Sequence, residues 1–175
     1  EHRQHERRVP VGSGIVERGA GVREQRGRDR IAHLRGEVER VIKELGPAAK
    51  SKGLSLDFTV KAKAEHIVNG DADQLRDHVI RNIIDNAIKY GGDGGLVEIA
   101  IGEGRAGYDY AVNVVDHGVG IEAQHVPRLT ERFYRVDAES SRKKKGTGLG
   151  LAIVKHIVHR HRGLLSIRST PGEGT

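Results

Sequence analysis

The chain has 175 residues, 36% of them hydrophobic, which suits one domain with a buried core and leaves no apolar run near the roughly 18 residues of a membrane span. Cysteine is absent, which excludes disulfides and thiolate metal sites. Methionine is absent too, and because a natural chain normally begins with Met, we expect a fragment of a longer protein. The net charge of +6 raises the question of nucleic-acid binding, but only 3% of residues are aromatic, so we expect no specific nucleic-acid partner. Because no apolar run is long enough to span a membrane, we also expect no membrane contact by this fragment.

The beginning of the chain lacks the pattern of a folded element. Residues 1–28 mix Arg, Glu and Gly with little apolar periodicity, and repeated glycines interrupt any helix. We expect a weakly ordered basic leader here, and a domain over residues 29–175. From Asp29 apolar residues recur at helical spacing until Gly46 and Pro47, which predicts an amphipathic helix. These residues are Ile31, Leu34, Val38, Val41, Ile42 and Leu45.

A strand and a second helix follow. Alternating apolar residues from Leu54 to Val60 predict a half-buried strand. The second helix has Asp71 or Asp73 as its N-terminal cap and ends at Gly91. Its apolar stripe consists of Leu75, Val79, Ile80, Ile83, Ile84, Ala87 and Ile88.

The rest of the chain alternates strands and helix. Residues 96–101 and 108–115 predict a hairpin, and residues 116–147 are loop-like. A third helix starts near Gly148, with Leu149, Ala152, Ile153 and Ile157 inward, and residues 164–167 predict a last strand. We therefore expect an α+β fold, a two-layer α/β sandwich whose mixed, mostly antiparallel sheet is covered on one face by three helices.

Candidate binding residues lie on the second helix. Asn82, Asn86 and Tyr90 are spaced four residues apart, so they share one side of the helix, with Lys89 beside them. Carboxamide oxygens can reach a metal ion, a lysine can meet phosphate, and a tyrosine can cover an apolar ring. An ordinary solvated helix face is the alternative.

A second candidate follows the hairpin. Asp116 precedes Gly118 and Gly120, which let the backbone approach a flat ligand, while a partly buried carboxylate can accept the amine of adenine. A tight surface turn is the alternative. Further on, Phe133 and Tyr134 lie in a charged loop, and we expect Phe133 to join a small satellite core.

Two more glycine-rich segments complete the set. Residues 146–151 open the third helix, whose free N–H groups can meet an anion, and residues 142–145 add positive charge upstream. The segment lacks the downstream acid of a Rossmann unit and the Gly-Lys-Ser of a P-loop, which disfavours both folds. Residues 172–175 form another glycine turn, which could be an ordinary hairpin turn.

Taken in order, these five segments resemble the N, G1, F, G2 and G3 boxes of the histidine kinase catalytic domain. That domain belongs to the ATPase superfamily shared with gyrase and Hsp90, and the resemblance covers roughly residues 29–175. Residues 131–137 and 146–163 look most like sensor kinases of the phosphate-starvation type. The resemblance implies a Bergerat-type ATP-binding fold in a cytoplasmic domain, whose full-length parent is anchored in the inner membrane.

The resemblance also assigns roles to residues. Asn86 would coordinate Mg²⁺ with support from Asn82, Lys89 would contact phosphate, and Tyr90 would pack beside adenine. Asp116 would bind the adenine amino group, and residues 124–147 would form a lid over ATP. The other residues that the resemblance places at the nucleotide are Gly118, Gly120, Ile121, Arg135, Lys145, Gly146, Thr147, Gly148, Leu149, Gly150 and Thr175.

The implied function is binding of Mg-ATP and transfer of its γ-phosphoryl group to a histidine on a separate dimerisation domain, upstream of a response regulator receiver domain. His5 lies in a segment similar to the acceptor box, although the Gly-broken residues after it cannot supply two long hairpin helices. Residues 1–28 would then be a linker or remnant of that domain. Since the chain ends at Thr175, we expect it to lack the strand that follows this turn in the family, so autonomous kinase activity is in question.

Two alternatives stay open. One is an ATP-driven switch of the gyrase or Hsp90 type, although that class has Glu where Asn82 stands. The other is an ATP-binding regulatory module without kinase activity, or a partner-binding anti-sigma-type kinase that acts on serine, although residues 131–135 favour the sensor kinase.

Overall fold

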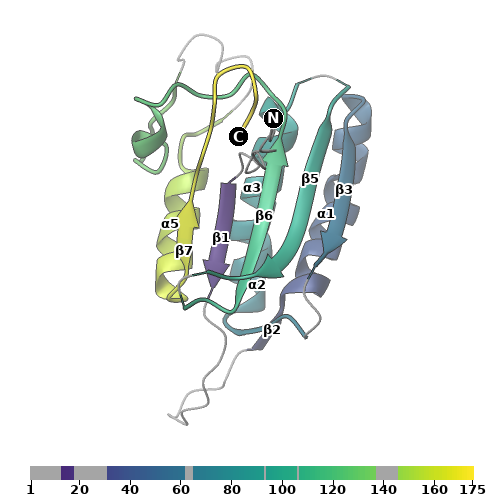
Figure 1. Ribbon diagram of the computed structural model, residues 1–175, viewed down its shortest axis with the longest axis vertical. Coiled ribbons are helices and arrows are strands. Elements are labelled where there is room, and N and C mark those ends of the chain that lie inside the picture. The colour runs from purple at the N-terminus through teal and green to yellow at the C-terminus, as the bar shows by residue number, and fades with distance from the viewer. Residues whose placement is uncertain (1–12, 18–30, 62–64, 93, 106, 137–145) are drawn as a thin grey trace, which may run out of the picture.

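The computed structural model describes residues 13–17, 31–61, 65–92, 94–105, 107–136 and 146–175. They form two layers, a five-stranded sheet and the helices that cover one of its faces (Figure 1). This arrangement confirms the predicted α/β sandwich with a mixed, mostly antiparallel sheet. Within these ranges no helix is long and apolar enough to cross a membrane.

The sheet has the strand order β3-β5-β6-β1-β7. β3 (Ser55–Val60) pairs in parallel with β5 (Leu96–Glu103), whereas β5 and β6 (Tyr110–Asp116) form the predicted antiparallel hairpin. β7 (Leu164–Ser166) lies at the other edge. A separate two-stranded sheet pairs β2 (Ile31–His33) with β4 (Ile67–Asn69).

β1 (Ser13–Glu17) differs from the expected leader, because these five residues form a strand inside the sheet. It pairs antiparallel with β6 and with β7, and among the described strands β7 joins the sheet through β1 (Figure 1). Strand pairing uses main-chain groups, so a short segment near glycines can pair even though its apolar residues are too few to predict a strand from the sequence.

Helices cover one face of the sheet (Figure 1). They are α1 (Leu34–Ser51), α3 (Arg81–Tyr90) and α5 (Gly150–Arg160), with the short η2 (Val126–Arg128) in the loop region. α2 (Ala72–Gln74) and the π-helical η1 (Leu75–Ile80) run without a break into α3. The predicted ends of this helix are confirmed, since the Asp71 side chain accepts a hydrogen bond from Gln74 N and Gly91 follows Tyr90 as the C-cap.

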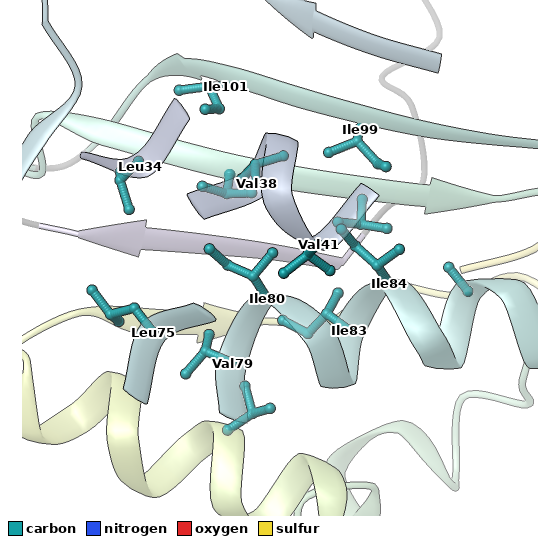
Figure 2. Packing of buried hydrophobic residues seen from close by; sticks show 14 of the residues in the cluster. Leu34, Val38, Val41, Leu75, Val79, Ile80, Ile83, Ile84, Ile99 and Ile101 are labelled. Carbon is teal, nitrogen blue, oxygen red and sulfur yellow. The ribbon is translucent and has the colours of Figure 1, made fainter. Parts of the chain in front are cut away.

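The core lies between the helices and the sheet. Figure 2 shows side chains of α1 and α3, among them Val38 and Ile84, in one cluster with Ile99 and Ile101 of β5. All four are at most 1% exposed. The apolar stripe predicted for the second helix is buried as expected.

Helix boundaries and one helix face differ from the prediction. Residues 31–33 form β2, so the first helix begins at Leu34 rather than near Asp29. It also continues through Pro47 to Ser51, and Ala49 in this last stretch is buried in the core. In α5 the buried residues are Val154, Ile157 and Val158, whereas Ile153, predicted to point inward, is 40% exposed.

Ile84→Ala removes a side chain with 0% exposure from the core. We expect the free energy of unfolding to fall by about 3 kcal/mol, because the variant loses buried apolar surface and leaves a cavity. Urea denaturation followed by circular dichroism measures the change. Ile153→Ala is the matched control at an exposed position and should cost less than about 1 kcal/mol. Equal losses in the two variants would contradict this core.

Candidate functional site

The polar side of α3 carries the first group of candidate residues. Asn82 and Asn86 are partly buried, and Tyr90 at the end of the helix is 39% exposed. The Asn82 amide nitrogen donates to the His78 carbonyl oxygen at 2.6 Å, whereas Asn86 has no side-chain hydrogen bond to another described residue. Lys89 forms an ion pair with Asp85 at 2.5 Å on the neighbouring side of the helix. The helix therefore presents two carboxamide oxygens on its polar side.

The polar side of α3, with Asn82, Asn86 and Tyr90, is called the α3 ridge, and the start of α5 lies against it at Asn82. A Cβ added to Gly150 would lie 2.8 Å from Asn82 Oδ1, so the glycine lets the two helices approach closely. Gly148 has a φ of +69° and its carbonyl oxygen accepts from Phe133 N at 2.9 Å. Gly146, Thr147 and Leu149 flank Gly148 in the same segment. The free N–H groups of the α5 start thus lie at the side of α3 that carries Asn82.

A loop over residues 116–121, the β6 loop, packs against the C-terminal end of α3. Asp116 ends β6 and is 7% exposed, and its Oδ1 accepts from Gly118 N at 3.0 Å. A Cβ on Gly118 would lie 1.9 Å from the Tyr90 carbonyl oxygen, so no larger residue fits without a shift of the backbone. The buried Asp116 carboxylate is therefore held next to the C-terminal end of the α3 ridge.

Residues 170–175, the terminal turn, pair with the β6 loop. Asp116 N donates to Thr175 O at 2.8 Å, Thr175 N donates back to Asp116 O at 3.3 Å, and Gly172 N donates to Val119 O at 2.8 Å. A Cβ on Gly120 would lie 2.0 Å from Thr170 O, and one on Gly174 would lie 2.0 Å from Asp116 O. Two glycine-rich segments that are distant in sequence thus form one compact structure.

Asp116 has a perturbed acidity. Burial raises the pKa of its carboxyl above the ordinary value of 3.8, because a charged group loses solvation in the protein. The backbone N–H groups of Gly118 and Thr175 and the nearby His117 act in the opposite direction with smaller effect. A buried carboxylate with few fixed partners suits recognition of a hydrogen-bond donor on a ligand.

The loop before α5 corrects one prediction. Phe133 is 70% exposed with a φ of +64°, so it does not join a satellite core. Tyr134 fixes the loop instead, since its hydroxyl lies 2.5 Å from His125 Nδ1 and the Arg128 guanidinium lies 4.2 Å from its ring centroid. Arg135 follows and is partly buried. Lys145 and His5 lie outside the described residues.

The structure brings together most of the predicted site. The α3 ridge meets Gly150 at Asn82 and meets Gly118 of the β6 loop at Tyr90. The β6 loop in turn contacts Thr175 through Asp116 and Ser169 through Ile121. Sequence reasoning missed Ser169, whose hydroxyl contacts Ile121, Gly174 and Thr175. It also missed His161, whose Nε2 accepts from Asp71 N at 3.0 Å. A single hydroxyl or imidazole carries no spacing signal that could have revealed either role.

Comparison with known families accounts for this arrangement. The profile described as "Histidine kinase-, DNA gyrase B-, and HSP90-like ATPase" matches residues 70–175, more than half of the chain. The chain therefore belongs to this ATPase family, which confirms the resemblance to histidine kinase catalytic domains.

Relatives among characterised proteins are sensor kinases. The chain is 41% identical over 128 residues to the phosphate regulon sensor protein PhoR of Pseudomonas aeruginosa, covering 73% of this chain and 27% of the relative. It is 45% identical over 109 residues to PhoR of Haemophilus influenzae, covering 62% and 25%. The chain thus spans about a quarter of the length of these two relatives.

Solved structures support the same fold. The mycobacterial sensor histidine kinase MprB matches with a TM-score of 0.64 and 23% identity, over 82% of this chain and 99% of that one. Full-length ShkA in complex with AMPPNP matches with a TM-score of 0.69 and 24% identity, over 88% and 31%. At these identities the likeness concerns the fold alone.

Asp116→Asn should change how stability depends on pH. Because the folded-state pKa of Asp116 lies above the unfolded-state value near 3.8, the wild type loses stability as the pH rises through this interval. Asparagine does not ionise, so the free energy of unfolding of the variant relative to wild type should rise from about pH 3 to neutral pH. Urea denaturation at several pH values measures this difference.

Asp57→Asn, on the exposed side of β3, controls for the substitution itself. A relative stability of Asp116→Asn that falls with rising pH would show that burial does not govern the Asp116 carboxyl.

Proposed function

We propose that this chain binds Mg-ATP and donates its γ-phosphoryl group to a histidine on the dimerisation domain of a two-component sensor kinase. The observation that carries the proposal is the buried Asp116 carboxylate, held by the β6 loop at the end of the helix that bears Asn82 and Asn86. A carboxylate there can accept a hydrogen bond from the amine of adenine. Membership of an ATPase family supports ATP as the ligand.

The phosphate end of ATP would lie along the α3 ridge. Asn86 and Asn82 would hold Mg²⁺, and the residues fit, because Asn82 uses an N–H on His78 and Asn86 has no side-chain partner among the described residues, which leaves both oxygens as ligands. Bound Mg²⁺ neutralises charge on the phosphates. Lys89 and the N–H groups at the start of α5 would contact the same phosphates, with Arg135 and Lys145 in the lid.

The chain's contribution to phosphoryl transfer would be positioning and charge compensation. A nitrogen of the acceptor imidazole forms a bond to the γ-phosphorus as the bond between that phosphorus and the β,γ-bridging oxygen breaks. ADP leaves, and the imidazole proton passes to a base beside the acceptor histidine. We propose that this domain acts in the cytoplasm as part of a membrane-anchored parent that phosphorylates a receiver domain.

Mg-ATP should bind the folded chain in a magnesium-dependent manner, measured by isothermal titration calorimetry with and without EDTA. Asn86→Ala and Asp116→Ala should each weaken binding about tenfold or more, since the first removes a magnesium ligand and the second a hydrogen-bond acceptor for the base. The two losses should differ in one respect. Asn86→Ala should reduce the dependence on magnesium, and Asp116→Ala should reduce the preference for ATP over GTP.

Asn113→Ala and Asp57→Ala are the matched controls, because both residues are exposed on strands of the sheet. Folded wild-type chain without nucleotide binding would contradict the proposal. Binding of ATP without formation of acid-labile phosphate on an added acceptor domain would favour the regulatory module.

A further inference from the structure

Ser169 lies between β7 and the terminal turn. It contacts the β6 loop and the terminal turn, two of the segments that form the candidate nucleotide site. Its hydroxyl oxygen is 2.8 Å from each of three partners, which are Ile121 N, Gly174 O and Thr175 Oγ1. The side chain is partly buried. One hydroxyl group thus joins the β6 loop to the terminal turn.

Hydrogen-bond directions at Ser169 follow from the chemistry of its partners. A hydroxyl has one proton to donate and two lone pairs to accept. The Gly174 carbonyl can only accept and the Ile121 amide can only donate, so Ser169 donates to the first and accepts from the second. Its remaining lone pair then accepts the Thr175 hydroxyl proton. Every hydrogen-bonding position of Ser169 is occupied, which fixes its three partners relative to one another.

The same partners determine the surroundings of Asp116. Thr175 exchanges two backbone hydrogen bonds with Asp116, and Ile121 ends the loop that Asp116 begins. A Cβ on Gly174 would lie 2.0 Å from Asp116 O, so the turn and the loop are already in close contact. Loss of the Ser169 hydroxyl would leave the Ile121 amide and the Thr175 hydroxyl without this partner, and the loop could then move away from the turn.

We propose that Ser169 is a positioning residue that holds the β6 loop and the terminal turn in the geometry that recognises the adenine base. It acts through Thr175 and Ile121 and does not itself touch the nucleotide. This inference rests on the proposed function for its consequence in ATP binding. The contact between the β6 loop and the terminal turn exists without nucleotide.

Ser169→Ala should weaken ATP binding about tenfold and reduce the preference for ATP over GTP, both measured by calorimetry at a temperature where the variant is folded. Guanine presents a carbonyl where adenine presents its amine, so the ratio of the two affinities reports the placement of Asp116. Ser169→Thr keeps the hydroxyl and should restore most of the affinity. Ser51→Ala is the matched control, because this exposed hydroxyl makes a single hydrogen bond to Ala48 O.

A purely structural role would give a different pattern. Ser169→Ala would then lower the melting temperature while the folded variant kept wild-type affinity and base preference, and that result would overturn the inference. Equal weakening of ATP and GTP would overturn it too. If Ser169→Ala does not fold, Thr175→Val serves as the second variant, since it removes the hydroxyl that donates to Ser169. Unchanged ATP affinity and base preference in folded Thr175→Val would contradict the role of Ser169.

Hydrogen exchange separates this inference from the proposed function. The Ile121 amide should exchange at least about tenfold faster in Ser169→Ala than in wild type, with no nucleotide present. An unchanged exchange rate at Ile121 would contradict the inference that Ser169 holds the β6 loop against the terminal turn. Wild-type chain that binds no ATP would overturn the proposed function, whereas wild-type binding that Ser169→Ala leaves intact would overturn the role of Ser169 alone.

Discussion

The burial of one side of α3 against the sheet is the interaction on which the core and the candidate site both depend. Ile84 and Ile88 are at most 3% exposed in the core, and their burial fixes the rotation of the helix. The opposite side then carries Asn82, which lies against Gly150 at the start of α5, and Asn86 one turn further along the helix. Helix periodicity therefore couples packing to function, because any rotation of α3 about its axis that moved the polar side would also move the apolar side out of the core.

Periodicity also explains which parts of the structure the sequence predicted. The apolar stripe of the second helix and the β5–β6 hairpin each follow a regular spacing, so their type and inner faces were predictable. A cap at Asp71 or Asp73 could be expected because a side-chain oxygen before a helix commonly accepts from a free backbone N–H, and the structure identifies Asp71 as that cap. The candidate site residues on α3 and in the β6 loop were found through their ordered motifs, whereas their contacts come from the structure.

Other features depend on tertiary contacts that no local pattern encodes. β1 and β2 are stabilised by main-chain pairing with distant strands. The part of α1 beyond Pro47 has Ala49 buried in the core, a contact that the local sequence does not reveal. On α5 the prediction of Ile157 as buried is confirmed, whereas Ile153 was assigned to the inner face in place of its neighbour Val154, because both fit the helical spacing almost equally well. Ser169 depends on three partners from two other segments, so its role could not be read from its neighbours in sequence.

The place of β1 between β6 and β7 in the sheet has a consequence for the order of folding. Ser13 pairs with Val114, and Gly14 pairs with Ser166, so these pairings close long loops at a high cost in chain entropy. The β5–β6 hairpin closes a short loop and can form early. During synthesis β1 emerges long before β6, and it therefore stays unpaired until most of the chain has been made.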